Sequence, residues 1–144
     1  MKKSLHYLLM ADHLSLQKML LARIKDINLT PGQPKVLDYL TDHDGSVQKD
    51  IAASCRIEPA TLTSVLLGME HKGLIMRKNK DGNRRSLYVF LTDKGRKTAE
   101  LVEKHFEETE KEILGGFTAK ETETLCVLLE KLNNNMTKED DKND

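Results

Sequence analysis

Tryptophan is absent from this sequence, and its 144 residues include only two cysteines and three prolines. Cys55 and Cys126 lie far apart and outside CxxC spacing, which excludes a local zinc ribbon or dithiol redox motif. No apolar run approaches the roughly 18 to 20 residues of a membrane span, and residues 8–11 form too short a block for a signal peptide. The composition therefore predicts a cytoplasmic protein with reduced thiols.

The sequence also lacks the common motifs of enzymes. It contains no GxSxG, no HExxH and no glycine-rich phosphate loop. None of its five histidines pairs with another at a metal-ligand spacing such as HxxxH. We therefore expect no catalytic activity, no metal site and no cofactor.

Net charge is missing as well, but the balance hides a segregation. Lysine and arginine total 23, as do aspartate and glutamate. Residues 47–97 hold 11 basic and 5 acidic side chains, a net of +6, whereas the remainder holds 12 basic and 18 acidic side chains, a net of −6. A basic central module flanked by acidic segments is compatible with binding to a polyanion such as nucleic acid.

Hydrophobic periodicity predicts helices in the first third of the chain. Apolar side chains at spacings of three and four indicate a helix over residues 4–27. Thr30, Pro31 and Gln33 then form the start signals of a second helix, with Thr30 as its cap and Pro31 in its first position. This helix is expected to end before the turn at residues 42–45.

Two further helices are predicted in close succession. A short one runs from Ser46, and a second one runs from Pro59 to about Lys72, where Gly73 ends it. Two helices of this size joined by a turn of a few residues are typical of a helix-turn-helix motif.

The period then changes to that of strands. Residues 74–78 and 86–91 read as two strands, and Asp81-Gly82 between them is a hairpin signal. The pattern predicts a two-stranded wing beside the helix-turn-helix.

Two more helices complete the predicted order. Thr92 caps a long helix that reaches about Ile113, and the Gly115-Gly116 pair breaks it. Thr118 and Glu121 form a capping box that opens a last helix with a leucine stripe. After Leu132 no apolar stripe continues, so the chain end is expected to be disordered.

These segments, in their order, carry a family resemblance. They are Leu29-Thr30-Pro31; Asp50-Ile51-Ala52 and Ile57 to Thr63; Leu66 and Met69 to Ile75; Asp81 and Arg84-Arg85-Ser86; and Val89 to Gly95. The ordered set, with a wing arginine and a closing LTxxG, resembles the MarR family of bacterial transcription regulators across nearly all of the predicted ordered chain. The resemblance implies a mainly α (α+β) fold, a winged helix-turn-helix, and a homodimer held together by N- and C-terminal helices.

The expected domain organisation follows from the helices and the resemblance together. We expect an N-terminal dimerisation helix over residues 1–29 and a winged helix-turn-helix over residues 30–95. Residues 96–136 are expected to supply C-terminal dimerisation helices, and residues 137–144 a disordered tail. The apolar stripes of the first and last helices are larger than one protomer obviously needs, which favours pairing over the alternative that they only cover the winged unit.

DNA contacts are predicted on the second helix of the motif and on the wing. Short side chains at the start of that helix can approach base edges in the major groove, whereas wing arginines suit a narrow minor groove or phosphates. The candidate DNA-binding residues are Arg56, Ala60, Thr61, Thr63, Ser64, Arg77, Lys78, Arg84 and Arg85. Asp81 is expected to pair with Arg84 and position it. The alternatives are an ordinary packed helix with a polar outer face, and a solvated turn whose charges keep an edge strand soluble.

The predicted function is therefore regulation of transcription by binding double-stranded DNA. We expect a homodimer on a pseudo-palindromic operator, acting as a repressor, and the resemblance alone gives the sign of regulation. The alternative is a winged-helix module that binds an acidic protein partner, because such a partner would satisfy the same basic surface.

An effector is expected from the resemblance, and the residues leave its nature open. Met10, Tyr39 and Met69 are candidates to line a pocket for a small apolar or phenolic ligand, although at helical spacing such residues also form core. Cys55 and Cys126 are candidates for an oxidant sensor. Cys55 lies beside Arg56, which is expected to lower the pKa of its thiol, and Cys126 lies on the last apolar stripe. The alternative for both thiols is a role as small apolar filler.

Overall fold

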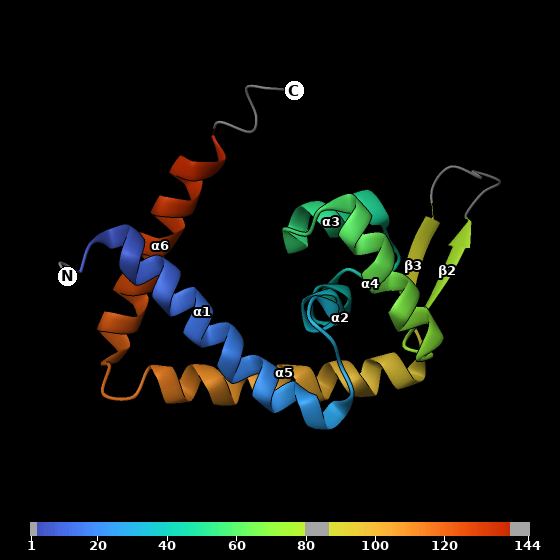
Figure 1. The fold of residues 1–144 in the computed structure, drawn as a ribbon, viewed down its shortest axis with the longest axis horizontal. Helices are drawn as coiled ribbons and strands as arrows, with labels where there is room; N and C mark the ends of the chain where they lie inside the picture. The colour runs from blue at the N-terminus through green and yellow to red at the C-terminus, as the bar shows by residue number, and fades with distance from the viewer. Residues whose placement is uncertain (1–2, 80–86, 139–144) are drawn as a thin grey trace. The chain divides into compact units, whose positions relative to one another are not determined.

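The computed structural model describes residues 3–79 and 87–138, and the chain divides into two compact units, residues 1–109 and 110–144 (Figure 1). The elements in chain order are α1 (Leu5–Ile24), the 3-10 helix η1 (Lys25–Ile27), α2 (Gln33–Asp42), β1 (Ser46–Val47), α3 (Gln48–Cys55), α4 (Pro59–His71), β2 (Ile75–Asn79), β3 (Leu87–Leu91), α5 (Asp93–Ile113) and α6 (Ala119–Thr137). Helices dominate and the single described sheet is small and antiparallel, so the predicted fold class is confirmed.

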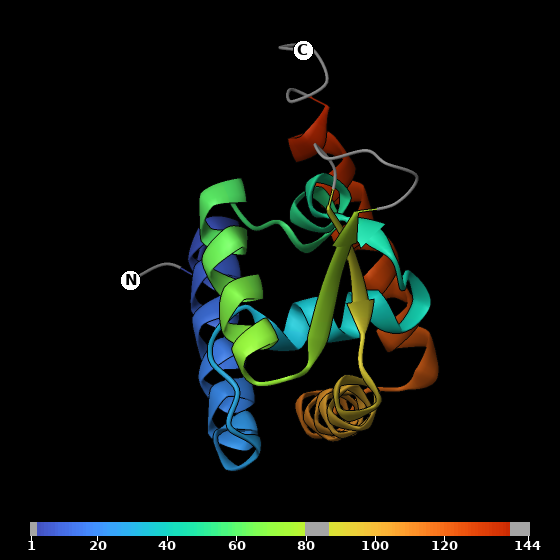
Figure 2. The ribbon, with the colours of Figure 1, turned by 90° about the vertical axis from the view of Figure 1, so that its right-hand side faces the viewer.

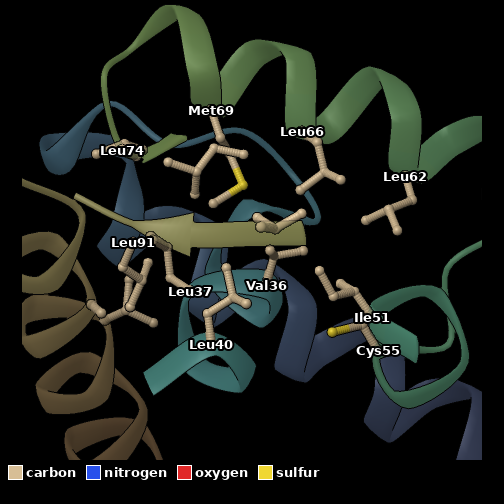
Figure 3. Close-up of a cluster of buried hydrophobic side chains, with 14 of the residues drawn as sticks. Val36, Leu37, Leu40, Ile51, Cys55, Leu62, Leu66, Met69, Leu74 and Leu91 are labelled. Carbon is tan, nitrogen blue, oxygen red and sulfur yellow. The ribbon is translucent and has the colours of Figure 1, made fainter. Parts of the chain in front are cut away.

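The core of the first unit lies between α4, α2, α3 and the sheet. Leu62, Leu66 and Met69 recur at spacings of four and three, and all three side chains point from α4 toward Val36 and Leu37 on α2 (Figure 3). Because these side chains are almost completely buried, their transfer from water stabilises the unit by about 1.5 to 3 kcal/mol each. The apolar face of α4 is thus used for packing, and its opposite face is left exposed.

The second helix begins two residues later than predicted. Pro31 precedes the helix, Gly32 occupies the cap position with a φ of 90°, and Gln33 is the first helical residue. Pro34 therefore falls in the first turn, where a backbone N–H has no intrahelical acceptor and its loss costs little. One half of the predicted capping box is present, because the amide of Thr30 donates to Gln33 Oε1 at 3.1 Å.

The sheet contains one strand more than the predicted wing. Its order is β1-β3-β2, and both pairings are antiparallel. The additional strand pairs Ser46 with Val89 and Val47 with Tyr88, and the amide of Gly45 donates to Val89 O at 2.8 Å. Two residues are too few to show an alternating pattern, which is why the sequence predicted helix from Ser46 instead. Figure 2 faces α4 and the β2–β3 hairpin, with α2 behind them.

The start of α5 agrees with its prediction. Thr92 Oγ1 accepts a hydrogen bond from the amide of Gly95 at 3.0 Å and donates to Gly73 O at 2.6 Å. One hydroxyl therefore caps α5 and ties it to the residue that ends α4. Gly95 itself faces the carbonyl of Leu74, and a Cβ built on it would lie 2.0 Å from that oxygen.

The second unit contains α6, which is longer than predicted. The capping box of Thr118 and Glu121 is formed, as predicted. The helix continues past Leu132 to Thr137, because the asparagines that follow lower helix propensity but include no glycine or proline to stop it. The expected disorder was therefore wrong for Thr137, and residues 139–144 lie outside the described part of the chain.

Candidate nucleic-acid interface

The first two turns of α4 present the predicted short side chains to solvent. Ala60, Thr61, Thr63 and Ser64 are all exposed. The hydroxyl of Thr63 donates to Pro59 O at 3.0 Å, so it remains available as an acceptor. Further along the same helix Leu67 is 46% exposed, an apolar group on a polar face. The first two turns therefore expose short side chains, whose hydroxyl and methyl groups suit contact with base edges in a major groove.

Arg56 lies at the turn that joins α3 to α4. It caps α3 in the left-handed conformation, with a φ of 55°, and its side chain is exposed. The structure thus brings this cation next to the start of α4, where a DNA backbone bordering the groove would pass.

Arg77 is held within the protein by hydrogen bonds to two other elements. Its Nε donates to Glu70 Oε2 at 2.7 Å, and its NH1 donates to Gln48 Oε1 at 3.4 Å. The hydrogen bond to Arg77 lowers the pKa of Glu70, and the same bond raises the pKa of Arg77. Arg77 therefore joins β2 to α4 and α3, a role that its position in a strand did not reveal.

Lys78 is exposed on β2 and its Nζ lies 5.6 Å from the ring centroid of Phe90, within cation–π distance. Asp81, Arg84 and Arg85 belong to the segment between β2 and β3 and lie outside the described residues. Their predicted roles stay predictions.

The sequence reading missed Asp44, which braces the sheet. One carboxylate oxygen accepts from the amide of Leu91 at 2.8 Å, and the other accepts from the guanidinium of Arg96 at 2.8 Å. The carboxylate therefore connects the α2–β1 turn to the end of β3 and to α5. A turn-forming Asp-Gly pair gave no sign of these partners, because they lie far along the chain.

Two hollows lie near α2. A largely apolar cavity of about 210 Å³ is lined by Gln17, Leu20, Leu21, Ile24, Pro31, Gly32, Pro34, Lys35 and Phe106. An open groove of about 480 Å³ shares Lys35 and Phe106 with this cavity and is also lined by Asp38, Tyr39, Asp42, His43, Ser54, Cys55 and Arg56. The rings of Tyr39 and His43 stack there, with centroids 4.4 Å apart.

The predicted pocket of Met10, Tyr39 and Met69 is wrong as a set. Met69 is fully buried in the core beneath α4, whereas Met10 is 70% exposed on α1. Of the three, Tyr39 lines the groove described above. Periodicity could not separate a core methionine from a pocket methionine, since both lie on a helix face.

The thiols also differ from the expected reactive pattern. Cys55 is buried, and its Sγ lies 3.7 Å from Lys35 O. Burial raises the pKa of this thiol, Lys35 lowers it by a smaller amount, and Asp38 adds a further, still smaller rise. The expectation that Arg56 would lower the pKa of Cys55 is therefore wrong. Cys126 is exposed on α6.

The described residues offer neither a cluster of metal ligands nor a membrane-spanning helix. Within residues 3–79 and 87–138, no group of three or more His, Cys, Asp and Glu side chains is placed to hold a metal ion. In the same part of the chain, no helix is long and apolar enough to cross a membrane.

Comparisons with known proteins agree with this geometry. The sequence model of the MarR family matches residues 29–87. The homoprotocatechuate degradative operon repressor of Escherichia coli is 31% identical over 107 residues, which cover 74% of this chain and 72% of that protein. The HTH-type transcriptional regulator YybA of Bacillus subtilis (strain 168) is 28% identical over 115 residues, covering 80% of this chain and 77% of the relative.

Solved structures extend the likeness to nearly the whole chain. A MarR family transcriptional regulator from Listeria monocytogenes, complexed with a 26mer DNA, has a TM-score of 0.88 at 25% identity and covers 96% of this chain and 92% of its own. The transcriptional repressor CouR, bound to a 23-mer DNA duplex, has a TM-score of 0.83 at 27% identity, with 91% and 93% covered. This chain belongs to the MarR family of transcriptional regulators, which are not enzymes.

Proposed function

We propose that this protein is a sequence-specific repressor that binds double-stranded DNA as a homodimer. The observation that carries the proposal is the exposed, short-side-chained start of α4, set beside a wing in a fold whose relatives include DNA-bound regulators. Ala60, Thr61, Thr63 and Ser64 read base edges in the major groove, and Arg56, Lys78, Arg84 and Arg85 bind the flanking backbone. Arg77 contributes less than predicted, because Glu70 already neutralises it.

A second copy of the chain is proposed to cover two apolar surfaces. On α1, Leu5, Leu8, Met10 and Leu14 are exposed. On α6, Leu125, Val127, Leu128 and Leu129 are exposed. Apolar helix faces of this kind mark an interface in a soluble domain, and two-fold pairing presents two α4 helices to the two halves of a palindrome. Analytical sedimentation tests this point: a mass that stays near the 16.4 kDa of one chain at all concentrations contradicts it.

The effector is proposed to be a small apolar or phenolic molecule in the cavity of about 210 Å³ between α1, α2 and α5. Leu20, Ile24 and Phe106 supply apolar walls, and Lys35 supplies one cation at the rim. Few polar groups in a mainly apolar hollow are typical of small-molecule sites. An oxidant acting on Cys55 is disfavoured by the raised pKa of its thiol.

Selection from random duplexes tests the DNA proposal. At low ionic strength the purified protein is expected to enrich a pseudo-palindrome and to retain it against excess random competitor DNA. Retention of no fragment over random DNA contradicts sequence-specific binding. The net charge of +6 in residues 47–97 also favours the alternative of an acidic protein partner, and competition with polyglutamate distinguishes it from DNA binding. If polyglutamate displaces the bound DNA as effectively as the selected duplex does, the result supports an acidic protein partner.

A further inference from the structure

Lys72, the residue that caps the C-terminus of α4, directs its ammonium group into the protein. Its Nζ donates to the carbonyl of Asn28 at 2.8 Å and to Gln33 Oε1 at 2.9 Å. The side chain is partly buried, and both of these acceptors are neutral. Hydrogen bonds from a charged donor to neutral acceptors are stronger than neutral pairs, so this cation is committed to the segment that joins η1 to α2. We call this segment, residues 28–33, the connector.

Gln33 completes the link from the connector side. Its side chain is only 2% exposed, and its Oε1 accepts both the Lys72 ammonium and the amide of Thr30. One oxygen therefore joins the backbone of the connector to the end of α4. The carbonyl of Lys72 is itself held by Lys94 Nζ at 2.7 Å, which fixes the helix end to α5.

One face of α4 and its cap lies on the connector over about two turns. A Cβ built on Gly32 would lie 3.1 Å from Val65 Cγ2, and one built on Gly68 would lie 3.0 Å from Gln33 Nε2. Val65, Gly68 and Lys72 follow each other at spacings of three and four, so they share a face of the helix. The contact is tight at its middle and hydrogen-bonded at its end.

We propose that Lys72 is a positioning residue for DNA recognition, which it serves by fixing the orientation of α4 on the connector through Gln33 and Asn28. The proposal rests on the proposed DNA-binding function. An ammonium with two internal acceptors is not free to leave for a phosphate without breaking both hydrogen bonds. Since base contacts depend on the placement of α4 to within a fraction of an ångström, loss of this link weakens recognition without removing a contact to DNA.

The salt dependence of binding distinguishes positioning from phosphate contact. The variants are Lys72→Met, which keeps the aliphatic stem, and Lys104→Met, the matched loss of an exposed lysine on α5. Lys72→Met is expected to weaken binding to the duplex selected by the wild type about tenfold, with the salt slope unchanged, because one charged hydrogen-bonded group is lost. Lys104→Met is expected to change neither. A salt slope lowered by about one unit in Lys72→Met overturns the proposal, because it assigns a phosphate contact.

Hydrogen exchange without DNA tests the link by itself. The amide of Thr30, which donates to Gln33 Oε1, is expected to exchange faster in Lys72→Met than in wild type or Lys104→Met, with circular dichroism showing that all three remain folded. Unchanged exchange overturns the link, whatever happens with DNA. Faster exchange together with no DNA preference in the wild type rejects the proposed function and leaves the link standing. A double-mutant cycle of Gln33→Leu and Lys72→Met in unfolding free energy must be non-additive, and additivity contradicts the pairing.

Discussion

Arg77 on β2 and Glu70 on the last turn of α4 form a hydrogen-bonded ion pair, with Nε 2.7 Å from Oε2. The pair joins β2, the first strand of the wing, to α4. Because Gln48 at the start of α3 also accepts from the guanidinium, one side chain contacts both helices of the helix-turn-helix and the wing.

This pair predicts a pH dependence of stability. The pKa of Glu70 is lowered in the folded protein, so the pair stabilises the fold above the unfolded pKa of about 4.3 and the effect is lost as pH falls through the folded pKa. A double-mutant cycle of Glu70→Gln and Arg77→Met is expected to give about 0.5 to 1 kcal/mol at pH 7, since Glu70 is partly exposed. The same cycle, measured by urea unfolding at pH 3, should give a smaller coupling energy, and an equal value at both pH values contradicts the ion pair.

Adjacent leucines on α4 are expected to differ sharply in their effect on stability. Leu66 is completely buried, so Leu66→Ala is expected to cost about 2 to 5 kcal/mol of unfolding free energy. Leu67 is 46% exposed, so Leu67→Ala should stay within about 0.5 kcal/mol of the wild type. Urea denaturation of the two variants checks the helix face, and similar losses would mean that the face is assigned wrongly.

Gly95 cannot be replaced by a larger residue without moving the backbone of Leu74, which directly precedes β2. Its missing Cβ would lie 2.0 Å from the carbonyl oxygen of Leu74, far inside van der Waals contact. Gly95→Ala is expected to destabilise by about 3 kcal/mol or more despite the better helix propensity of alanine. Lys97→Ala, an exposed change two residues along α5, is the control and should be nearly neutral in thermal unfolding. A stabilised Gly95→Ala variant would show that α5 and Leu74 are not in this contact.

Cys55 is expected to react slowly with alkylating agents and peroxide. Because burial raises the pKa of its thiol, the pH midpoint of its iodoacetamide reaction should lie above the value of about 8.5 for a free cysteine. The measurement uses Cys126→Ser, so that only Cys55 reports. A midpoint below 8.5 or loss of DNA binding at low peroxide would restore the redox switch that we disfavour.

Substitutions in the wing and on α4 are expected to affect DNA binding in different ways. Arg84→Ala should weaken binding to every duplex and lower the salt slope by about one unit, because it removes a cation from the phosphate backbone or minor groove. Thr61→Ala and Thr63→Ala should instead reduce discrimination between duplexes by about 1 kcal/mol each with an unchanged slope. Competition binding at several salt concentrations gives both quantities. Wild-type slope and affinity in Arg84→Ala, or full discrimination in both threonine variants, would reject the respective role.

The sequence predicted the parts of the fold that depend on local signals. Thr92, Thr118 and Glu121 cap helices where their short-range patterns placed them, and the hydrophobic period of α4 identified its buried face. Strand β1 escaped prediction because two residues have no period, and it forms only by pairing with β3. The link of Lys72 to Gln33 joins residues that are 39 apart in sequence, and no local pattern encodes such a contact.

The candidate site residues also separate into those that local patterns predict and those that depend on contacts distant in sequence. Exposure of Ala60, Thr61 and Thr63 follows from helix periodicity, which fixes the outer face once the inner one is known. The hydrogen bond from Arg77 to Glu70 does not follow from periodicity, because the sequence pattern of an arginine in a strand is the same whether it faces DNA or another side chain. The chemistry of Cys55 was misjudged because burial, which proximity to Arg56 in the sequence does not reveal, is the largest influence on the pKa of its thiol.

Phe106 lines both the apolar cavity and the neighbouring groove, as does Lys35. A smaller side chain at this position would enlarge both hollows, and a bulkier one would narrow each. A substitution at this single position on α5 could therefore change which molecules fit the cavity and the groove. A change at Phe106 leaves the outer face of α4 untouched, so under the proposed function the preference for an effector and the preference for a DNA sequence can change independently.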